Sequence, residues 1–396
     1  MFDALVWLEP DLRDAGGHFL DLARAMRAAA NELGLDAVVV GSREAHETIG
    51  DLTVVPALDR MSARHAPRWA GGYVIDPLLA SRRIETQLRE RVTPLCGPRT
   101  LVIASSVNHR HYRALGSWLD GFADTEAPAL ALMLRVSELD AACGRRRPTA
   151  VLTRRGLRGL GRTSARRSVR LLTDSEELAR EYGELTPLPI AVVPTPYLVP
   201  AALEAPSPDP GRPLRLGFFG QARGEKGFPA LVDAVDLLAA SGRLDKLALT
   251  VQCYVRPGYE DQVALDSSSA LAATARLLTE MLAPDQYVAE LAACDAVLLP
   301  YSAERYRSRT SGVFVDALAA GRPVVTTKGS WMSRQLDRHG AGVTYDGGTG
   351  EALADAIEEL RKRWPELRSA AAASAAAWRT GRHPRDMLAA VARLFA

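Results

Sequence analysis

The chain has 396 residues, which is longer than a single α/β core usually grows, so two domains are expected. Hydrophobic residues make up 47% and charged residues 24%, a balance that excludes an intrinsically disordered or collagen-like chain. The formal net charge is only +2, and no aromatic residues interleave a basic run, so a nucleic-acid partner is not expected.

The first residues, MFDALVWLEPDLRDAGG, lack the basic region and apolar run of a signal peptide. No stretch of about 18 apolar residues occurs elsewhere, so no membrane-spanning helix is expected. These observations predict a cytoplasmic protein. The four cysteines are far apart, without a Cys-x-x-Cys spacing, and predict neither a zinc site nor a disulfide framework.

The first half alternates apolar runs with amphipathic segments. A strand at 4–8 is followed by a helix at 17–34 and a strand at 37–42, an order that predicts a parallel sheet. Further strands are expected at 52–57, 100–106, 129–136, 170–175 and 190–196. Residues 1–197 are therefore predicted to form a Rossmann-like N-terminal domain.

Residues 198–213 contain five prolines and show no periodicity, so they are predicted to be the domain linker. The alternation then restarts, with strands expected at 214–220, 247–255, 296–301 and 323–327 and helices at 227–240, 287–293 and 312–320. Residues 214–375 are expected to form a second doubly wound α/β domain. The C-terminal helix at 376–396 is expected to pack back on the first domain.

A basic segment stands out against the near-neutral charge. Ten arginines lie from Arg145 to Arg170, and no Asp or Glu occurs between Asp140 and Asp174. Clustered arginine favours anionic surfaces, so peripheral contact with lipid head groups or with a pyrophosphate-linked acceptor is one interpretation. The other is a solvated helix face.

The sequence FFGQARGEKG, residues 218–227, ends an apolar strand in Gly220 and leads into a helix through a basic loop. Such a turn offers backbone N–H groups to a phosphate, and Lys226 adds a positive charge. Gly227 permits the turn. The alternative is a tight turn with a solvated lysine.

A second motif lies in residues 302–325, after the predicted strand at 296–301. Thr310, Ser311 and Gly312 stand at a predicted helix start, where unpaired amides and the helix dipole favour an anion. Arg307 and Arg309 would add guanidinium groups. Asp316 could accept hydrogen bonds from a ribose, or be a solvated carboxylate.

These two motifs resemble the retaining glycosyltransferases of the GT-B fold, in the family-four group of sugar transferases. The resemblance implies two Rossmann-like domains facing across a cleft, with a nucleotide-diphosphate-sugar donor bound by the second. Gly220, Lys226 and Gly227 match the family's strand-to-loop motif. Gln221 stands where the family usually has arginine, and Arg223 could supply that charge.

The stretch from Asp316 to Val324 is similar to the family's E-A-x-A-x-G-x-P-V element, which places Asp316 at the glutamate implied to hold the ribose. Ser308 stands where the family has its other glutamate, a departure at the sugar contact.

In the first half, Gly16 and Gly17 form a Gly-Gly turn similar to the family's first loop, where backbone approaches the donor or acceptor. His18 follows at the helix start. His109 and His111 come after another predicted strand, and a histidine facing the cleft is implied to contact the sugar. His109 is preferred as that residue.

The expected activity is transfer of a sugar to an acceptor hydroxyl, the acceptor being a saccharide or a lipid-linked molecule. Lys226 and Arg223, with His109 and His18, are the predicted catalytic residues. No Asp-x-Asp run occurs, which predicts a metal-independent reaction without a cofactor, and the resemblance implies retention. The alternatives are a nucleotide-sugar epimerase of the same architecture and a catalytically silent binding or scaffold protein.

Overall fold

The computed structural model describes residues 2–14, 18–60, 72–139, 146–199, 211–255 and 262–396. The chain forms two compact units. Unit 1 comprises Met1–Pro194 and His383–Ala396, and unit 2 comprises Thr195–Arg382. Each unit has its own sheet and its own hydrophobic core.

The sheet of unit 1 has the strand order β3-β4-β2-β1-β5-β6-β7-β8. Neighbouring strands are parallel except β3 and β4, which are antiparallel. The strands are β1 (Ala4–Leu8), β2 (Asp36–Ser42), β3 (Thr48–Ile49), β4 (Leu52–Leu58), β5 (Thr100–Ala104), β6 (Ala129–Met133), β7 (Val169–Thr173) and β8 (Ile190–Val192). The central strands are continuous apolar runs because helices cover both faces.

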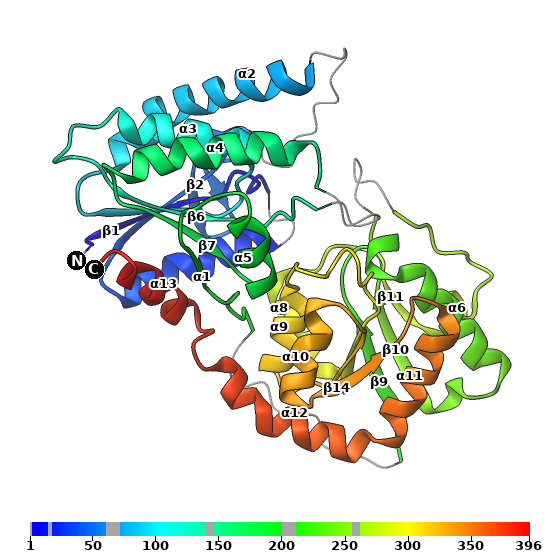
Figure 1. The fold of residues 1–396 in the computed structure, drawn as a ribbon. Coiled ribbons are helices and arrows are strands. Elements are labelled where there is room, and N and C mark those ends of the chain that lie inside the picture. The colour runs from blue at the N-terminus through cyan, green and yellow to red at the C-terminus, as the bar shows by residue number, and fades with distance from the viewer. Residues whose placement is uncertain (1, 15–17, 61–71, 140–145, 200–210, 256–261) are drawn as a thin grey trace. The chain divides into compact units, whose positions relative to one another are not determined.

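Helices α2, α3 and α4 pack over one face of this sheet, and α1 and α13 lie together on the other (Figure 1). The helices are α1 (His18–Glu32), α2 (Gly72–Gln87), α3 (His109–Asp120), α4 (Thr149–Ser164), α5 (Glu176–Gly183) and α13 (Pro384–Arg393). A short π-helix, η1 (Leu88–Val92), and a 3-10 turn, η2 (Thr93–Leu95), follow α2. None of the helices in the described part of the chain combines the length and hydropathy needed to span a bilayer.

Unit 2 contains a fully parallel sheet of order β11-β10-β9-β12-β13-β14. Its strands are β9 (Leu214–Phe218), β10 (Leu247–Gln252), β11 (Arg276–Leu278), β12 (Ala296–Leu299), β13 (Val324–Thr327) and β14 (Gly342–Tyr345). Its helices are η3 (Gly224–Lys226), α6 (Phe228–Ala240), η4 (Leu244–Lys246), α7 (Ala270–Thr274), α8 (Pro284–Ala293), α9 (Gly312–Ala319), α10 (Trp331–His339), α11 (Gly350–Lys362) and α12 (Trp364–Arg379). Helices α6 and α11 pack together, and α12 packs against α9 and α10 (Figure 1).

The prediction of two doubly wound α/β sheets is confirmed. Several boundaries differ. The strand expected at 247–255 ends at Gln252, and β11, β14 and α10 had no counterpart among the expected elements. The units divide between Pro194 and Thr195, and residues 376–382 belong to unit 2, so only His383–Ala396 joins unit 1. Most of the segment predicted to be the linker, residues 200–210, lies outside the described residues.

The topology selects one position in each sheet for a ligand. In an open parallel sheet, ligands bind beyond the carboxyl ends of the strands, where the strand order changes direction. That point lies between β9 and β12 in unit 2 and between β1 and β5 in unit 1. Both predicted phosphate-binding motifs of unit 2 follow these strands directly.

Candidate functional site

The loop after β9 has a backbone that glycine alone adopts easily. Gly220 has φ 131° and Gly227 has φ 69°. A Cβ on Gly227 would clash with the carbonyl oxygen of Pro300, so this glycine lets the loop lie directly against the end of β12. The N–H of Gly220 donates to Oε1 of Gln252 at 2.8 Å, which fixes the loop to the end of β10. The loop is therefore held from both neighbouring strands.

Lys226 folds back over this loop instead of extending into solvent. Its Nζ lies against Gly220, where a Cβ would collide with it, and stands 5.5 Å from the centroid of the Tyr301 ring. Burial, together with the positive charges of Arg223 and Arg309, lowers the pKa of Lys226 to about 8. An anion bound beside Nζ would oppose both effects.

Glu225 joins the two predicted motifs. Its carboxylate forms ion pairs with Arg223 at 3.1 Å and with Arg309 at 3.4 Å, and its carbonyl accepts from the N–H of Ser302 at 2.9 Å. The guanidinium of Arg309 also stacks on Tyr306, 4.7 Å from the ring centroid. The lysine-bearing turn and the loop before α9 therefore meet at one edge of the sheet.

Helix α9 begins at this edge. Ser311 is its N-cap, and the Ser311 Oγ accepts from the N–H of Phe314 at 3.3 Å. Gly312, the first residue of α9, is exposed. Thr310 lies just before the cap, and its hydroxyl is 3.3 Å from that of Thr195. The amides of the first turn add positive potential to that of the neighbouring cations.

Other predicted donor residues lie near this edge but have different surroundings. Arg307 is exposed, and its carbonyl accepts from the guanidinium of Arg334. Gln221 is buried and forms an isolated parallel bridge with Tyr254. Ser308 is also buried, so the position of the absent glutamate faces the interior.

Asp316 is engaged within unit 2. Its side chain is buried; one carboxylate oxygen accepts from the N–H of Leu198 at 2.7 Å and the other from the hydroxyl of Tyr287 at 3.2 Å. A ribose hydroxyl would have to share or displace these donors. Ribose binding by Asp316 stays a prediction, and the structure adds a role in fixing the segment that contains Leu198.

In unit 1, Gly16 and Gly17 lie outside the described residues, and His18 is the first residue of α1, without a described side chain. His109 is the first residue of α3 and is partly buried. Burial and the adjacent Arg110 lower the pKa of His109 to about 4, so its imidazole is neutral near pH 7.

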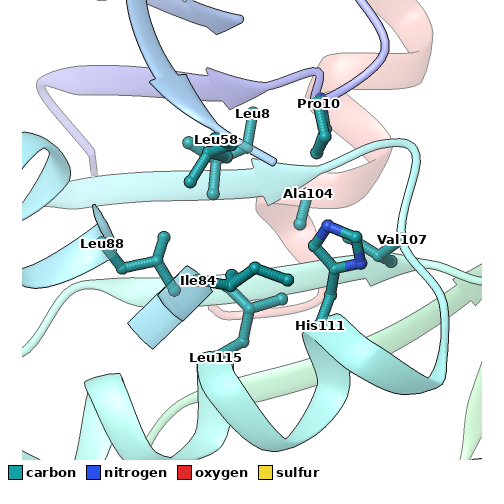
Figure 2. A pocket seen from close by; sticks show the side chains of 9 residues that line it. All are labelled: Leu8, Pro10, Leu58, Ile84, Leu88, Ala104, Val107, His111 and Leu115. Atoms are coloured by element: carbon teal, nitrogen blue, oxygen red, sulfur yellow. The ribbon is translucent and has the colours of Figure 1, made fainter. Parts of the chain in front are cut away.

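His111 points into an apolar pocket between the sheet and the helices that cover it (Figure 2). The pocket is lined by Leu8, Pro10, Leu58, Ile84, Leu88, Ala104, Val107, His111 and Leu115. The imidazole Nδ1 lies 3.1 Å from the side-chain oxygen of Asn108, the N-cap of α3, so His111 is part of the helix cap. This placement favours His109 over His111 as a ligand-facing histidine.

Three contributors to the unit 2 site were not predicted from the sequence: Glu225, Tyr301 and Tyr306. The only local signal was that Glu225 lies inside the predicted phosphate loop and Tyr301 ends a predicted strand. Within the described residues, no group of three or more His, Cys, Asp and Glu is placed to hold a metal ion.

Comparison with protein families matches residues 213–363 to the model described as "Glycosyl transferases group 1". The matched range contains the loop after β9, the loop before α9 and all of the unit 2 sheet. No curated protein sequence matches the chain significantly.

Solved structures share the fold over nearly the whole chain. The Anabaena protein HepE in complex with UDP is 15% identical with a TM-score of 0.64, covering 99% of each chain. The trehalose 6-phosphate synthase from Burkholderia multivorans is 12% identical with a TM-score of 0.67, covering 100% of this chain and 96% of that one. Sucrose-phosphate synthase from Thermosynechococcus elongatus is 12% identical with a TM-score of 0.63, covering 98% and 94%. The chain therefore has the GT-B fold, and its residues 213–363 match the group 1 glycosyltransferases.

Proposed function

We propose that this chain is a glycosyltransferase that moves a sugar from a nucleotide-diphosphate-sugar to an acceptor hydroxyl. The observation that carries the proposal is the cluster of Lys226, Arg223 and Arg309 around Glu225, beside the start of α9. The cluster lies at the switch point of the unit 2 sheet, inside the range that matches the glycosyltransferase family. Its charge and geometry suit a diphosphate.

The chemical demand is stabilisation of charge on the leaving diphosphate as the glycosidic bond breaks. Lys226 places its ammonium directly against the backbone of Gly220, in the space that a Cβ would occupy. Arg309 pairs with Glu225 and lies just before the start of α9, whose first-turn amides add positive potential. These groups supply positive charge from two loops of the sheet, so we propose a metal-independent reaction. Retention of configuration is part of the proposal through the resemblance.

For the donor, the first candidates are UDP-sugars, because solved structures of the similar HepE contain UDP and UDP-glucose. The acceptor is proposed to bind unit 1, as a saccharide or as part of a lipid-linked molecule. His109, near the carboxyl end of β5, is proposed to contact the transferred sugar, with His18, Gly16 and Gly17 as further contacts.

The arginine-rich segment is only partly available to a lipid surface. Several of its arginines contact residues of unit 1: Arg146 with Glu184, Arg154 with the Glu184 carbonyl, Arg166 with Asp120, Arg167 with Asp124, and Arg170 with the Leu394 carbonyl. Arg155, Arg158 and Arg162 form an exposed stripe along α4. Peripheral contact of a cytoplasmic enzyme with anionic lipids is proposed through this stripe.

The function is tested by release of nucleoside diphosphate from UDP-, GDP-, ADP- and TDP-sugars, with and without saccharide acceptors. Lys226→Ala should abolish release with the accepted donor. Lys246→Ala is the matched control, because Lys246 is exposed just before β10, at the opposite edge of the same sheet. Equal turnover in both variants would refute the assignment of Lys226.

The same assay separates the alternatives. An epimerase would convert the donor to an epimer without acceptor and without releasing nucleoside diphosphate. A silent scaffold would show no turnover with any donor, whether or not it binds nucleotides.

A further inference from the structure

The carboxyl edge of the unit 1 sheet contains a polar cluster that the proposed donor chemistry does not use. Glu9 directly follows β1 and its side chain is completely buried, yet among the described residues no donor makes a hydrogen bond of regular geometry to either carboxylate oxygen. Burying a carboxylate without hydrogen bonds is costly. Such a group marks a place where a ligand can supply the missing donors.

Strand register brings a second polar group beside Glu9. Leu8 pairs with Ala104, and the ladder continues with the N–H of Ser105 donating to the Leu8 carbonyl at 2.9 Å. Glu9 and Ser105 are therefore the next neighbours across the two strands, on the same face. Ser105 is completely buried, and its hydroxyl likewise makes no hydrogen bond of regular geometry within the described part of the chain.

Arg135 completes the cluster from the adjacent strand. It follows β6, and its Nε and one terminal nitrogen have no hydrogen-bond partner among the residues that the structure describes, although Nε lies 3.8 Å from the carboxylate of Asp174. Its positive charge acts on Glu9. Arg135 is 18% exposed, so the cluster reaches the surface at this side chain.

The cluster is distinct from the apolar pocket of His111. Leu8 and Pro10 line that pocket (Figure 2), and side chains alternate along a strand, so Glu9 is directed to the opposite face. Val6 and Leu8 belong to the core beneath α2, α3 and α4. Glu9 therefore lies on the face that α1 covers.

The unpartnered atoms decide the chemistry of the ligand. Glu9 needs donors, whereas Arg135 needs acceptors, and a hydroxyl group provides both. An ammonium group would leave Arg135 without acceptors and face its positive charge. A phosphate would leave Glu9 without donors and face its negative charge. A carboxylate that needs donors beside a guanidinium that needs acceptors therefore matches neighbouring hydroxyls on a sugar or polyol.

We propose that Glu9, Ser105 and Arg135 form a subsite for a polyhydroxylated ligand at the switch point of the unit 1 sheet. Identifying this ligand as the sugar acceptor rests on the proposed function. The binding itself does not.

The charged surroundings of Glu9 set the direction of the pH effect. Burial raises the pKa of Glu9 to about 7; Asp11 on the same loop adds to this, and Arg135 with the hydroxyls of Ser105 and Ser106 opposes it. Ligand hydroxyls donate to the ionised carboxylate and favour it. Binding below pH 7 must therefore release a proton, and affinity falls by up to about tenfold for each pH unit below 7.

His111, on the opposite face of the sheet, does not add a second titration in this range. Burial lowers the pKa of His111 to about 4, with the positive charge of Arg110 contributing in the same direction. The Nε of Arg60 lies 3.9 Å from the carboxylate of Asp11.

The test is direct binding of methyl α-D-glucoside and inositol to the full chain by saturation-transfer NMR at pH 5.5 to 8.5. The wild type should bind at least one probe most tightly above pH 7. Glu9→Ala should weaken binding at least about tenfold, since it removes hydrogen bonds to a charged group. Glu9→Gln should remove the pH dependence, and the exposed control Glu126→Gln should match the wild type.

Two results would overturn the subsite: Glu9→Ala binding the probes as tightly as the wild type, or no probe binding to the wild type at pH 8. Displacement of the bound probe by putrescine or inorganic phosphate would contradict the hydroxyl chemistry. UDP binding by the Glu9 variants is measured in parallel. If neither the wild type nor the Glu9 variants bound UDP, the result would count against the proposed function, whereas the saccharide subsite would still stand.

Discussion

Replacing Glu9 by glutamine should make the protein more stable above neutral pH. The side chain is completely buried, and the pKa of Glu9 is raised from 4.5 to about 7. The folded chain therefore holds the proton more tightly than the unfolded chain does. The stability that this provides is complete below pH 4.5 and is lost as the pH rises through 7.

The magnitude follows from the size of the shift. A displacement from 4.5 to about 7, at 1.36 kcal/mol for each pH unit, corresponds to about 3 kcal/mol. Glutamine has nearly the same shape and no charge to bury. Relative to the wild type, Glu9→Gln should therefore gain about 3 kcal/mol between pH 4.5 and pH 8. Such a gain is typical when a residue kept for binding is replaced.

Differential scanning calorimetry at pH 4.5 and pH 8 measures this difference. The transition of unit 1 is identified as the one whose Tm does not rise when UDP is added, because UDP is proposed to bind unit 2. For a unit of about 200 residues, 3 kcal/mol corresponds to a shift in Tm of about 6 to 12 °C. Glu126→Gln, on the surface of the same unit, should show no such shift. The reasoning fails if Glu9→Gln is less stable than the wild type at pH 8, or if their difference does not change with pH.

Three further outcomes concern unit 2. Gly227→Ala should destabilise the unit by more than about 2 kcal/mol in urea unfolding, because the alanine would have to adopt a φ of 69° and its Cβ would clash with Pro300. A variant as stable as the wild type would contradict the tight approach of the loop to β12. Nucleoside-diphosphate affinity should fall up to about tenfold per pH unit above 8 as Lys226 loses its proton, and calorimetry on Lys226→Arg should show a flat profile to pH 10. Arg309→Ala should raise the Kd for the diphosphate about tenfold or more, whereas Arg307→Ala, at an exposed position, should change this Kd less than threefold. Equal effects of the two variants in a titration would show that the contact between Arg309 and Glu225 does not organise the site.

The sequence was most informative where structure depends on local pattern. The apolar runs at 214–220 and 296–301 predict buried parallel strands, and both are present as β9 and β12, which end at Phe218 and Leu299. The strand β11 was missed because Arg276–Leu278 is too short to show a period, and it is defined by pairing with β10. Helix α10 was missed because its pattern is largely polar, and it is stabilised by packing of Trp331 and Leu336 in the unit 2 core.

The candidate site shows the same limit. Glycines and a lysine close together in the chain indicated the phosphate loop, since turn chemistry is local. The pairing of Glu225 with Arg309 and the internal hydrogen bonds of Asp316 depend on contacts between distant segments. Glu9 carried no site signal in the sequence, because its burial and its neighbours, Ser105 and Arg135, arise only when three strands align.

The central claim is that Lys226 and its neighbours bind a diphosphate, and isothermal titration calorimetry with UDP, GDP, ADP and TDP at pH 7 tests it most directly. At least one nucleotide should bind the wild type and Lys246→Ala equally. Lys226→Ala should bind the same nucleotide about 10- to 100-fold more weakly, from the loss of 1.5–3 kcal/mol typical of a hydrogen bond to a charged group. Binding of that nucleotide to Lys226→Ala with wild-type affinity, or binding of none of the four to the wild type, would contradict the account.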